Sequence, residues 1–267
     1  MAQRTSSAFT VGNGTRQGGI LSPCLFNRYI YDLLLLVSRQ KVGCNIGGVF
    51  ANVFAYADDI VLLAPSWQAL QALLRVLENG ILAIDMSCNT RKTVCMVFSP
   101  RQKRKVVSPH FPPLRLFGTD LLYVDNFKYL GHIIDNKLND DADIQREIRN
   151  LFTRANILTR RFSLCSQSVK VALFKSYCIS LYGCALWRNH TVSSLSKLRS
   201  CYHRCVKTFF GYKRHDSMTA VLFKLSIPSF NTLLHNSRCI LRSQTVNCIN
   251  SLLQACCSRV AAIIWRW

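Results

Sequence analysis

The stretch "FAYADDIVLLA", residues 54–64, places two adjacent carboxylates, Asp58 and Asp59, in the middle of an otherwise apolar run. A strand this apolar is expected to be buried, and buried charge is costly unless it is paired or binds a metal. Two carboxylates about 4 Å apart repel each other by about 4 kcal/mol at an effective dielectric constant of about 20. The sequence therefore predicts a cation at this pair.

Successive side chains of a strand point to opposite faces, so Asp58 and Asp59 can point the same way only if they occupy a turn between "VFAY" and "IVLLA". A polar turn without a function is the alternative, since aspartate is common in turns. The usual hairpin-forming glycine or asparagine is missing, however, and both flanks are strongly apolar. These features favour a divalent-metal site on a hairpin.

The chain has 267 residues, 49% of them hydrophobic, so it can bury one large core or two small ones and is too apolar to be disordered throughout. No apolar run approaches the roughly 18 residues that span a bilayer. Residues 1–19 contain no continuous apolar segment of the signal-peptide type. We therefore expect an intracellular chain, in the nucleus or the cytoplasm, without a secretion signal and without a membrane partner.

The net charge of +21 is concentrated in the C-terminal half. Residues 1–147 hold 16 Lys and Arg and 12 Asp and Glu, a balance of +4, whereas residues 148–267 hold 18 Lys and Arg and one acid, a balance of +17. Such a field attracts polyanions, and basic residues spread over a folded region favour nucleic acid over a membrane surface. A merely solubilising surface is the alternative. The aromatic residues of this half fit helix packing better than base stacking: Tyr177, Tyr182, Trp187 and Tyr202.

Thirteen cysteines without an export signal are expected to be mostly small buried hydrophobes in a reducing compartment. The cluster to weigh as a metal site is "CYHRC", residues 201–205, with His215 downstream. Its two cysteines have helical i, i+4 spacing and no second pair accompanies them, whereas zinc sites favour tighter pairs. The pattern favours buried thiols over zinc.

The first half of the chain reads as strands mixed with helices. Residues 21–39 have apolar residues at helical spacing, with Ser22 as the N-cap and Pro23 at the first helical position. Residues 66–84 fit a second helix with one apolar stripe. Strands are expected in six segments: "GGVFANVFAY", "IVLLA", "TVCMVFS", "LRLFG", "LLYV" and "FKYLGHII".

From about residue 141 the pattern is helical almost to the end. Mixed elements followed by helices alone predict an α+β fold, with one domain over residues 1–139 and a basic, helical domain over residues 140–267. The basic segment "PRQKRKVVSPHFPP", residues 100–113, fits a nuclear-import signal or a solvated hairpin tip equally well.

Several segments, taken in order, resemble reverse transcriptases. "TRQGGILSPCLFNRYI" resembles their Q-G-x-x-x-S-P segment, and "FAYADD" resembles their Y-x-D-D catalytic turn. "NTRKTVCMVFS" stands where the lysine-bearing segment lies, and "FKYLGHIID" where the primer-grip hairpin lies. "SYCISLYGCALW", followed by a basic helical tail, is similar to the region after the polymerase core in non-LTR (LINE-like) retrotransposons. The resemblance covers nearly the whole chain from about residue 8.

This resemblance implies an RNA-directed DNA polymerase in which residues 1–139 form a partial palm, an antiparallel sheet with packed helices, and residues 140–267 form a thumb-like helical region. Members of the family extend a DNA primer on an RNA template, using deoxynucleoside triphosphates. Two Mg²⁺ ions, about 3.5–4 Å apart, stabilise the attacking and leaving oxygens, and Mn²⁺ is a possible substitute. RNA template, DNA primer and the RNA–DNA hybrid are the implied partners, whereas protein partners are not indicated.

Matching the motifs residue by residue implies roles in the catalytic region. Asp58 is implied as the main metal ligand and Asp59 as the supporting one, with the small side chain of Ala57 at the primer end. Gln17 and Gly18 match the loop that lies against the template and the nascent base pair. Glycine allows close backbone approach there, and glutamine supplies both donors and acceptors.

Two further segments carry implied roles. Lys92 matches a lysine that protonates the leaving pyrophosphate, and an exposed lysine at the end of a strand is the alternative. Tyr129, Leu130 and Gly131 match the primer-grip hairpin, where a small residue lets the primer backbone come close.

The chain departs from the family before residue 17. A working polymerase of this type uses a third aspartate on a strand that precedes the Q-G loop, and none of the sixteen residues before Gln17 is acidic. The fingers subdomain is missing as well, so Met1 is interpreted as an internal start, or as an arbitrary boundary, within a longer element. We therefore expect this chain alone to be inactive. The alternative functions are a non-catalytic remnant that grips the backbone of an RNA–DNA duplex, and a helical interaction protein with incidental charge.

Overall fold

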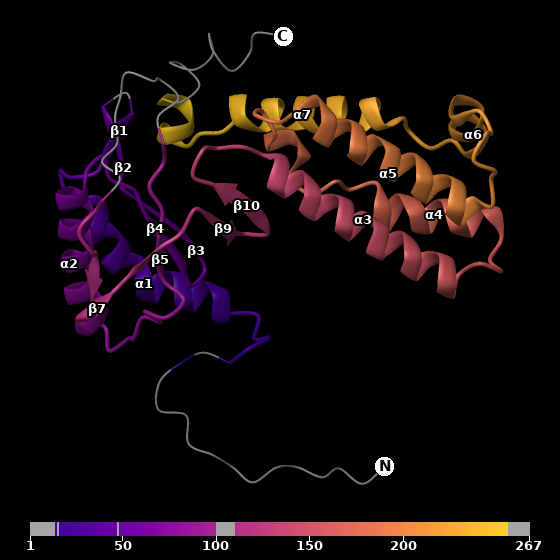
Figure 1. The fold of residues 1–267 in the computed structure, drawn as a ribbon. Helices are drawn as coiled ribbons and strands as arrows, with labels where there is room; N and C mark the ends of the chain where they lie inside the picture. The colour runs from indigo at the N-terminus through magenta and orange to yellow at the C-terminus, as the bar shows by residue number, and fades with distance from the viewer. Residues whose placement is uncertain (1–13, 15, 47, 100–109, 256–267) are drawn as a thin grey trace, which may run out of the picture. The chain divides into compact units, whose positions relative to one another are not determined.

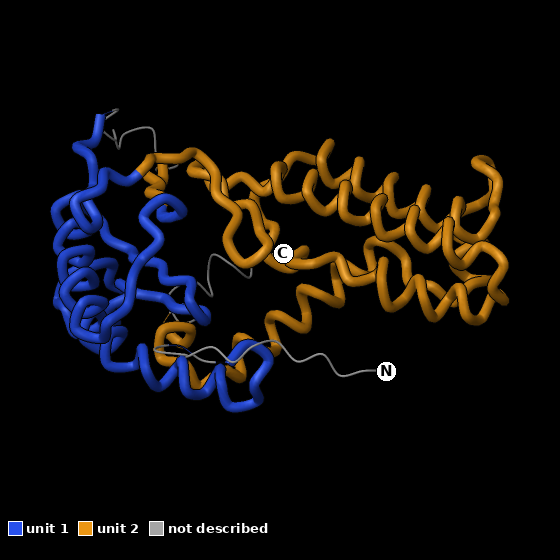
Figure 2. The backbone as a smooth tube through the Cα atoms, turned by 90° about the horizontal axis from the view of Figure 1, so that it is seen from below, with its two compact units in different colours: residues 1–93, 110–121, 258–267 blue, residues 94–109, 122–257 orange. Residues whose placement is uncertain are grey.

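The computed structural model describes residues 14, 16–46, 48–99 and 110–255. These residues divide into two compact units, each with its own hydrophobic core (Figure 2). The first unit takes in the described residues up to Thr93 together with His110–Leu121, and the second takes in the remainder. The contacts thus group residues 122–139 with the helical region, although we expected them in the first domain. The functional division into residues 1–139 and 140–267 stays a prediction.

The first helix of unit 1, α1 (Ser22–Ser38), lies where the sequence predicts it. The predicted N-cap is wrong, because Leu21 occupies that position and Ser22 is the first helical residue. The Ser22 hydroxyl instead donates a hydrogen bond to the carbonyl of Arg16, at 2.6 Å. This hydroxyl is therefore not available to cap the helix. Pro23 lies in the first turn, where a backbone N–H would have no partner within the helix, so the missing N–H of proline costs nothing there.

The second helix, α2 (Trp67–Ala83), begins at an N-cap serine, Ser66, whose hydroxyl accepts a hydrogen bond from the backbone of Ala69. Its predicted apolar stripe faces the core and packs against α1 (Figure 1). The two helices approach closely at Gly80, where a Cβ atom would lie 2.4 Å from a methyl group of Leu33. A side chain at position 80 would therefore displace the Leu33 side chain from this crossing.

Three antiparallel hairpins complete the described part of unit 1: β1 (Cys44–Ile46) with β2 (Val49–Ala51), β3 (Val53–Tyr56) with β4 (Asp59–Leu62), and β6 (Arg115–Leu116) with β7 (Thr119–Asp120). Helix α2 holds β6 through Gln71, whose side-chain amide exchanges two hydrogen bonds with the backbone of Arg115, at 3.0 and 2.9 Å. The expected antiparallel pairing is present, but as separate two-stranded ladders rather than as one sheet.

Unit 2 begins with four short strands: β5 (Val94–Cys95), β8 (Leu122–Tyr123), β9 (Asn126–Tyr129) and β10 (His132–Asp135). β9 and β10 form an antiparallel hairpin, whereas β5 and β8 pair in parallel, which the sequence did not predict. The strand expected over "TVCMVFS" is reduced to β5.

The rest of unit 2 is helical, as predicted: α3 (Asp141–Arg161), α4 (Gln167–Cys178), the 3₁₀ helix η1 (Cys184–Leu186), α5 (Val192–Phe210), α6 (Met218–Leu225) and α7 (Phe230–Val246). Helix α3 packs along α4 and α5 (Figure 1). Buried Leu151, Phe174 and Tyr202 join these three helices into one core. The unit therefore has a core of its own, independent of the hairpins of unit 1.

The cysteines of the described residues are free thiols. Cys201 and Cys205 are buried with their sulfur atoms 4.0 Å apart, and no group of three or more potential metal ligands occurs in the described part of the chain. Both thiols of this pair are buried, but only five of the eleven described cysteines are, so the expectation that most of them are buried is wrong for the described residues. None of the helices described is long and apolar enough to cross a bilayer. The basic residues 100–109 lie outside the described residues.

Candidate active site

The two aspartates lie at the tip of the β3–β4 hairpin. Tyr56 pairs with Asp59, so the loop consists of Ala57 and Asp58 alone. The prediction that a bend separates the two apolar segments is confirmed. The prediction that both aspartates occupy the bend is wrong for Asp59, which is the first residue of β4.

The tip of this hairpin is exposed, although its apolar sequence predicts burial. Phe54 is 39% exposed and Tyr56 is 65% exposed. The ladder has only two strands, and it contributes Val53, Ile60 and Leu62 to the α1–α2 core. Asp58 and Asp59 are exposed, and their carboxylates form no hydrogen bond or ion pair with any described residue. Because both carboxylates are exposed, water screens their charges. The cost of burying charge, from which the sequence predicts a cation, therefore does not apply here.

The loop is backbone-strained at Ala57, whose φ of 51° lies in the left-handed region. This region costs a residue with a Cβ about 1–2 kcal/mol, and glycine is the usual occupant. Such strain concentrates at functional sites, where the surrounding structure enforces it. The strained tip sets the direction in which Asp58 leaves the hairpin.

The base of this hairpin is fixed by Asn52, which is 1% exposed. Its side-chain nitrogen lies 3.0–3.4 Å from four carbonyl oxygens at the end of α1 and beyond it, those of Val37, Ser38, Gln40 and Val42. The backbone carbonyl of Asn52 accepts a hydrogen bond from the backbone amide of Leu63. Asn52 therefore ties β3 and β4 to α1. Sequence reasoning missed this residue, although an asparagine within an apolar run is a usable signal.

Gln17 and Gly18 form the central pair of a β-turn, closed by a hydrogen bond from the Gly19 amide to the Arg16 carbonyl, at 3.1 Å. Gly18 has a φ of +77°, which the third position of a type II turn requires. Both residues are exposed, and a Cβ atom on Gly18 would meet no other atom. The helix that follows, α1, packs against β3, so the turn and the aspartate hairpin belong to the same unit.

Lys92 lies in a turn just before β5, where its amide donates to the backbone and side-chain oxygens of Asn89. Its side chain is exposed and contacts no partner among the described residues. This exposed position fits both a proton donor and a solvated lysine.

The second hairpin, β9–β10, has the same construction in unit 2. Tyr129 pairs with His132, which leaves Leu130 and Gly131 as its two-residue loop. Both loop residues have positive φ, 45° and 84°, as a type I′ turn requires. The three residues matched to the primer grip therefore share one turn. This turn belongs to unit 2, whereas Asp58 belongs to unit 1.

Comparison with known proteins decides the family. A family model described as "Reverse transcriptase (RNA-dependent DNA polymerase)" matches residues 1–134, half of the chain. The chain belongs to the reverse transcriptase family. The match contains both the aspartate hairpin and the β9–β10 turn.

The similar proteins are polyproteins of mobile elements. The chain is 33% identical over 144 residues to the Retrovirus-related Pol polyprotein from type-1 retrotransposable element R2 of Nasonia vitripennis, which covers 50% of this chain and 14% of the relative. It is 25% identical over 222 residues to the RNA-directed DNA polymerase from mobile element jockey of Drosophila funebris. This match covers 77% of this chain and 23% of the relative. The predicted non-LTR type is confirmed. The chain spans less than a quarter of the length of these relatives.

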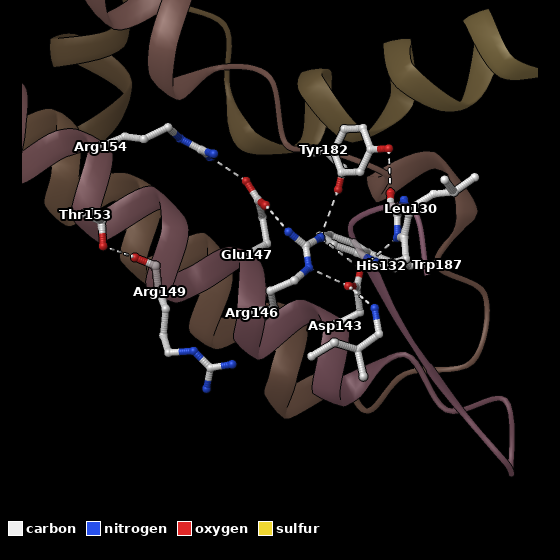
Figure 3. A network of polar contacts seen from close by, with 11 residues as sticks. Leu130, His132, Asp143, Arg146, Glu147, Arg149, Thr153, Arg154, Tyr182 and Trp187 are labelled. Carbon is white, nitrogen blue, oxygen red and sulfur yellow. Dashed lines mark hydrogen bonds and ion pairs between the residues drawn. The ribbon is translucent and has the colours of Figure 1, made fainter. Parts of the chain in front are cut away.

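In this reverse transcriptase chain, the β9–β10 turn adjoins a buried polar network centred on Asp143 of α3, drawn in Figure 3. The carboxylate of Asp143 is 2% exposed and accepts hydrogen bonds from the Ile133 amide at 2.9 Å, the Trp187 indole at 2.8 Å and the Arg146 guanidinium at 2.6 Å. The His132 ring nitrogen Nδ1 lies 3.1 Å from Oδ2, the oxygen that also accepts from Trp187. One carboxylate thus joins β10, α3 and the residue after η1.

Burial alone raises the pKa of Asp143, but the hydrogen bonds from Arg146, Ile133 and Trp187, and the charge of Arg146, outweigh it. They lower the pKa to about 2, from an ordinary value of 3.8. The carboxylate is therefore ionised at neutral pH, which keeps the Arg146 charge balanced in the interior. Sequence reasoning missed Asp143 because only the fold brings its partners together.

Most of the described basic residues of unit 2 lie on its helices. Burial, and then the positive charges of Arg199 and Lys207, lower the pKa of His203 on α5. Trp187 and Tyr202 are buried, as expected of helix-packing aromatic residues, at 1% and 0% exposure. That expectation is wrong for two others, Tyr177 and Tyr182, which are more than half exposed.

Proposed function

We propose that this chain is the part of a non-LTR retrotransposon reverse transcriptase that carries the catalytic hairpin and binds an RNA template and a DNA primer. The observation that carries the proposal is the β3–β4 tip, which presents two adjacent exposed carboxylates without a partner among the described residues. It lies within the residues that match the family. A structural aspartate would be expected to bond to a neighbour, as Asp143 does.

The donor chemistry of the tip fits Mg²⁺, with Asp58 as the main ligand and Asp59 as the supporting one. Mg²⁺ prefers carboxylate oxygens and keeps water and substrate phosphates as its other ligands, so two protein carboxylates suffice for a seat that substrate completes. Bound ions would supply charge stabilisation to the oxygens of the transferred phosphoryl group, and Mn²⁺ is a possible substitute.

The other matched residues would then position the substrates. The exposed Gln17–Gly18 turn, with open space at Gly18, would lie against the template and the incoming deoxynucleoside triphosphate. Ala57, beside Asp58, would contact the primer end, and the Tyr129–Gly131 turn would contact the primer backbone. Lys92 would donate a proton to the leaving pyrophosphate.

We further propose that these 267 residues alone do not polymerise. The sequence has no acidic residue before Asp32, so it supplies no third carboxylate from a preceding strand. Loss of one such ligand is expected to reduce the rate by about 10³-fold or more. The test is primer extension on an RNA template with Mg²⁺ or Mn²⁺. Templated extension that is lost in Asp58→Ala would refute inactivity while supporting the catalytic role of the hairpin.

The charge distribution favours a second function, in which the helical region binds duplex without catalysis. A balance of +17 over residues 148–267 should make binding to an RNA–DNA hybrid fall steeply with salt. Neutralising exposed Arg160 and Arg161 at the end of α3 with glutamine should lower the salt slope by about one for each phosphate that is no longer neutralised. Arg115→Gln in unit 1 is the control. A flat salt response would exclude this function.

A further inference from the structure

We propose that Tyr182 is a positioning residue, which holds the Leu130–Gly131 turn in the conformation that meets the primer. The inference rests on the proposed primer contact of that turn. Tyr182 lies between α4 and η1, some fifty positions along the chain from the turn, and no matched motif assigns it a role.

The turn needs external support because of its sequence. A two-residue loop with positive φ at both positions favours Asn-Gly, yet Leu130 occupies the first position at φ 45°. A branched apolar side chain has no local hydrogen bond with which to stabilise the left-handed region. Such a conformation persists only where its surroundings enforce it.

Tyr182 supplies that support through three consecutive residues of the turn (Figure 3). Its hydroxyl donates a hydrogen bond to the Leu130 carbonyl, at 2.9 Å. Its ring lies 3.0 Å from the position that a Cβ atom on Gly131 would take, so only glycine fits there without displacement. The ring also stacks on His132, with the centroids 4.9 Å apart. Tyr182 therefore contacts the turn both through its hydroxyl group and through its ring.

Tyr182 is itself held in place by contacts with Arg146. Arg146, the partner of Asp143, lies 3.4 Å from the Tyr182 carbonyl, and its guanidinium is 6.0 Å from the centre of the ring. The next residue, Gly183, has a φ of +76°, and a Cβ atom on it would lie 1.6 Å from the His132 ring. The network around Asp143 is thus continuous with the turn.

The exposure of Tyr182 distinguishes this role from ordinary core packing. Tyr202 is fully buried in the helical core, whereas Tyr182 is 53% exposed. A half-exposed ring contributes little to a core, whereas its hydroxyl and its ring both contact residues 130–132. Leu130 and Gly131 are themselves only partly buried, so a primer could reach the turn.

The first test is hydrogen exchange of the peptide that covers residues 126–135, in the full chain. Tyr182→Phe keeps the ring and removes only the hydroxyl, and it should accelerate exchange in this peptide by about two- to tenfold, the worth of one neutral hydrogen bond. Tyr177→Phe, at 55% exposure on α4, is the matched control and should change nothing. Unchanged exchange in Tyr182→Phe would overturn the inference.

A suppressor distinguishes positioning from general loosening. Leu130→Asn creates the sequence that a type I′ turn prefers, so it should return exchange in the Tyr182→Phe background to the wild-type rate. Failure of Leu130→Asn to restore slow exchange would show that Tyr182 does not act by holding the turn backbone.

The second test addresses the primer. An RNA–DNA hybrid whose primer carries a photoreactive 3′-terminal nucleotide should crosslink to residues 126–135 in the wild type, and about two- to tenfold less in Tyr182→Phe. Faster exchange with unchanged crosslinking would overturn the positioning role. Binding of the hybrid without any crosslink to the turn would also overturn it, and absence of binding altogether would contradict the proposed function. The exchange measurement reports on the tyrosine–turn contact independently of both.

Discussion

The β3–β4 and β9–β10 hairpins have the same construction and opposite surroundings. Each has two four-residue strands, a two-residue loop and a non-glycine residue with positive φ at the first loop position. The loop of β9–β10 is held by Tyr182, and the strand after it by Asp143. The tip of β3–β4 is exposed, and the hairpin is held at its base by Asn52.

This difference shows how a protein can anchor a hairpin and keep the side chains at its tip accessible. A hairpin anchored at its base leaves the carboxylates at its tip without protein partners, so their oxygens can accept a metal ion. A hairpin supported at its loop has its backbone position set by the protein and presents a fixed surface. The first arrangement suits a ligand-binding tip, and the second suits a contact with a polymer backbone.

The largest effect is expected at Asp143. Asp143→Asn removes one of the two carboxylates that pair with Arg146 in the interior, the other being Glu147, and it should lower the free energy of unfolding of unit 2 by about 3–5 kcal/mol. Asp58→Asn, at the exposed tip of the other hairpin, should change stability by less than about 0.5 kcal/mol. Chemical denaturation of both variants measures the contrast. Equal effects would refute the distinction between the two sites.

A smaller loss is expected at the base of the first hairpin. Asn52→Ala leaves buried carbonyl oxygens at the end of α1 without their donor and should cost about 1–3 kcal/mol. Exposed Asn126, at the start of β9, is the matched control, and Asn126→Ala should be nearly neutral. Hydrogen exchange should localise the loss to β3 and β4. A loss spread evenly over both hairpins would contradict an anchor at the base.

The pH dependence of stability should follow the same contrast. Because the folded-state pKa of Asp143, about 2, lies below the unfolded value, its contribution is fully present above about pH 4 and is lost as pH falls through 2. The pKa difference corresponds to about 2 kcal/mol. The free energy of unfolding of the wild type should fall between pH 4 and pH 2 more steeply than that of Asp143→Asn. Parallel curves would show that Asp143 does not titrate as proposed.

The smallest effect concerns the strained loops. Ala57→Gly relieves the positive φ but adds chain entropy to the unfolded state, for a net stabilisation of about 0.5 kcal/mol. Thermal unfolding measures it, with Ala55→Gly in β3 as a control that should destabilise. A destabilised Ala57→Gly would show that the tip is not strained in solution.

Local patterns in the sequence predicted the elements, whereas contacts between distant segments could not be predicted. The apolar stripe of α2 and the bend at Asp58 follow from periodicity and were found where expected. Ser22 was misassigned because its hydroxyl bonds to a preceding turn. The exposure of the apolar residues Phe54 and Tyr56 was not predicted, because the sequence does not reveal how many strands pair with β3. Tyr182 and Asp143 gain their roles only from the fold.

The most direct test of the account is Mn²⁺ binding to the full chain, followed by electron paramagnetic resonance with an RNA–DNA hybrid and a non-hydrolysable deoxynucleoside triphosphate present. Asp58→Asn should weaken binding at least about tenfold, as loss of a metal ligand would. Asp32→Asn, an exposed carboxylate on α1, should bind like the wild type. Equal Mn²⁺ affinity in the wild type and Asp58→Asn would contradict the assignment of this hairpin as the metal site.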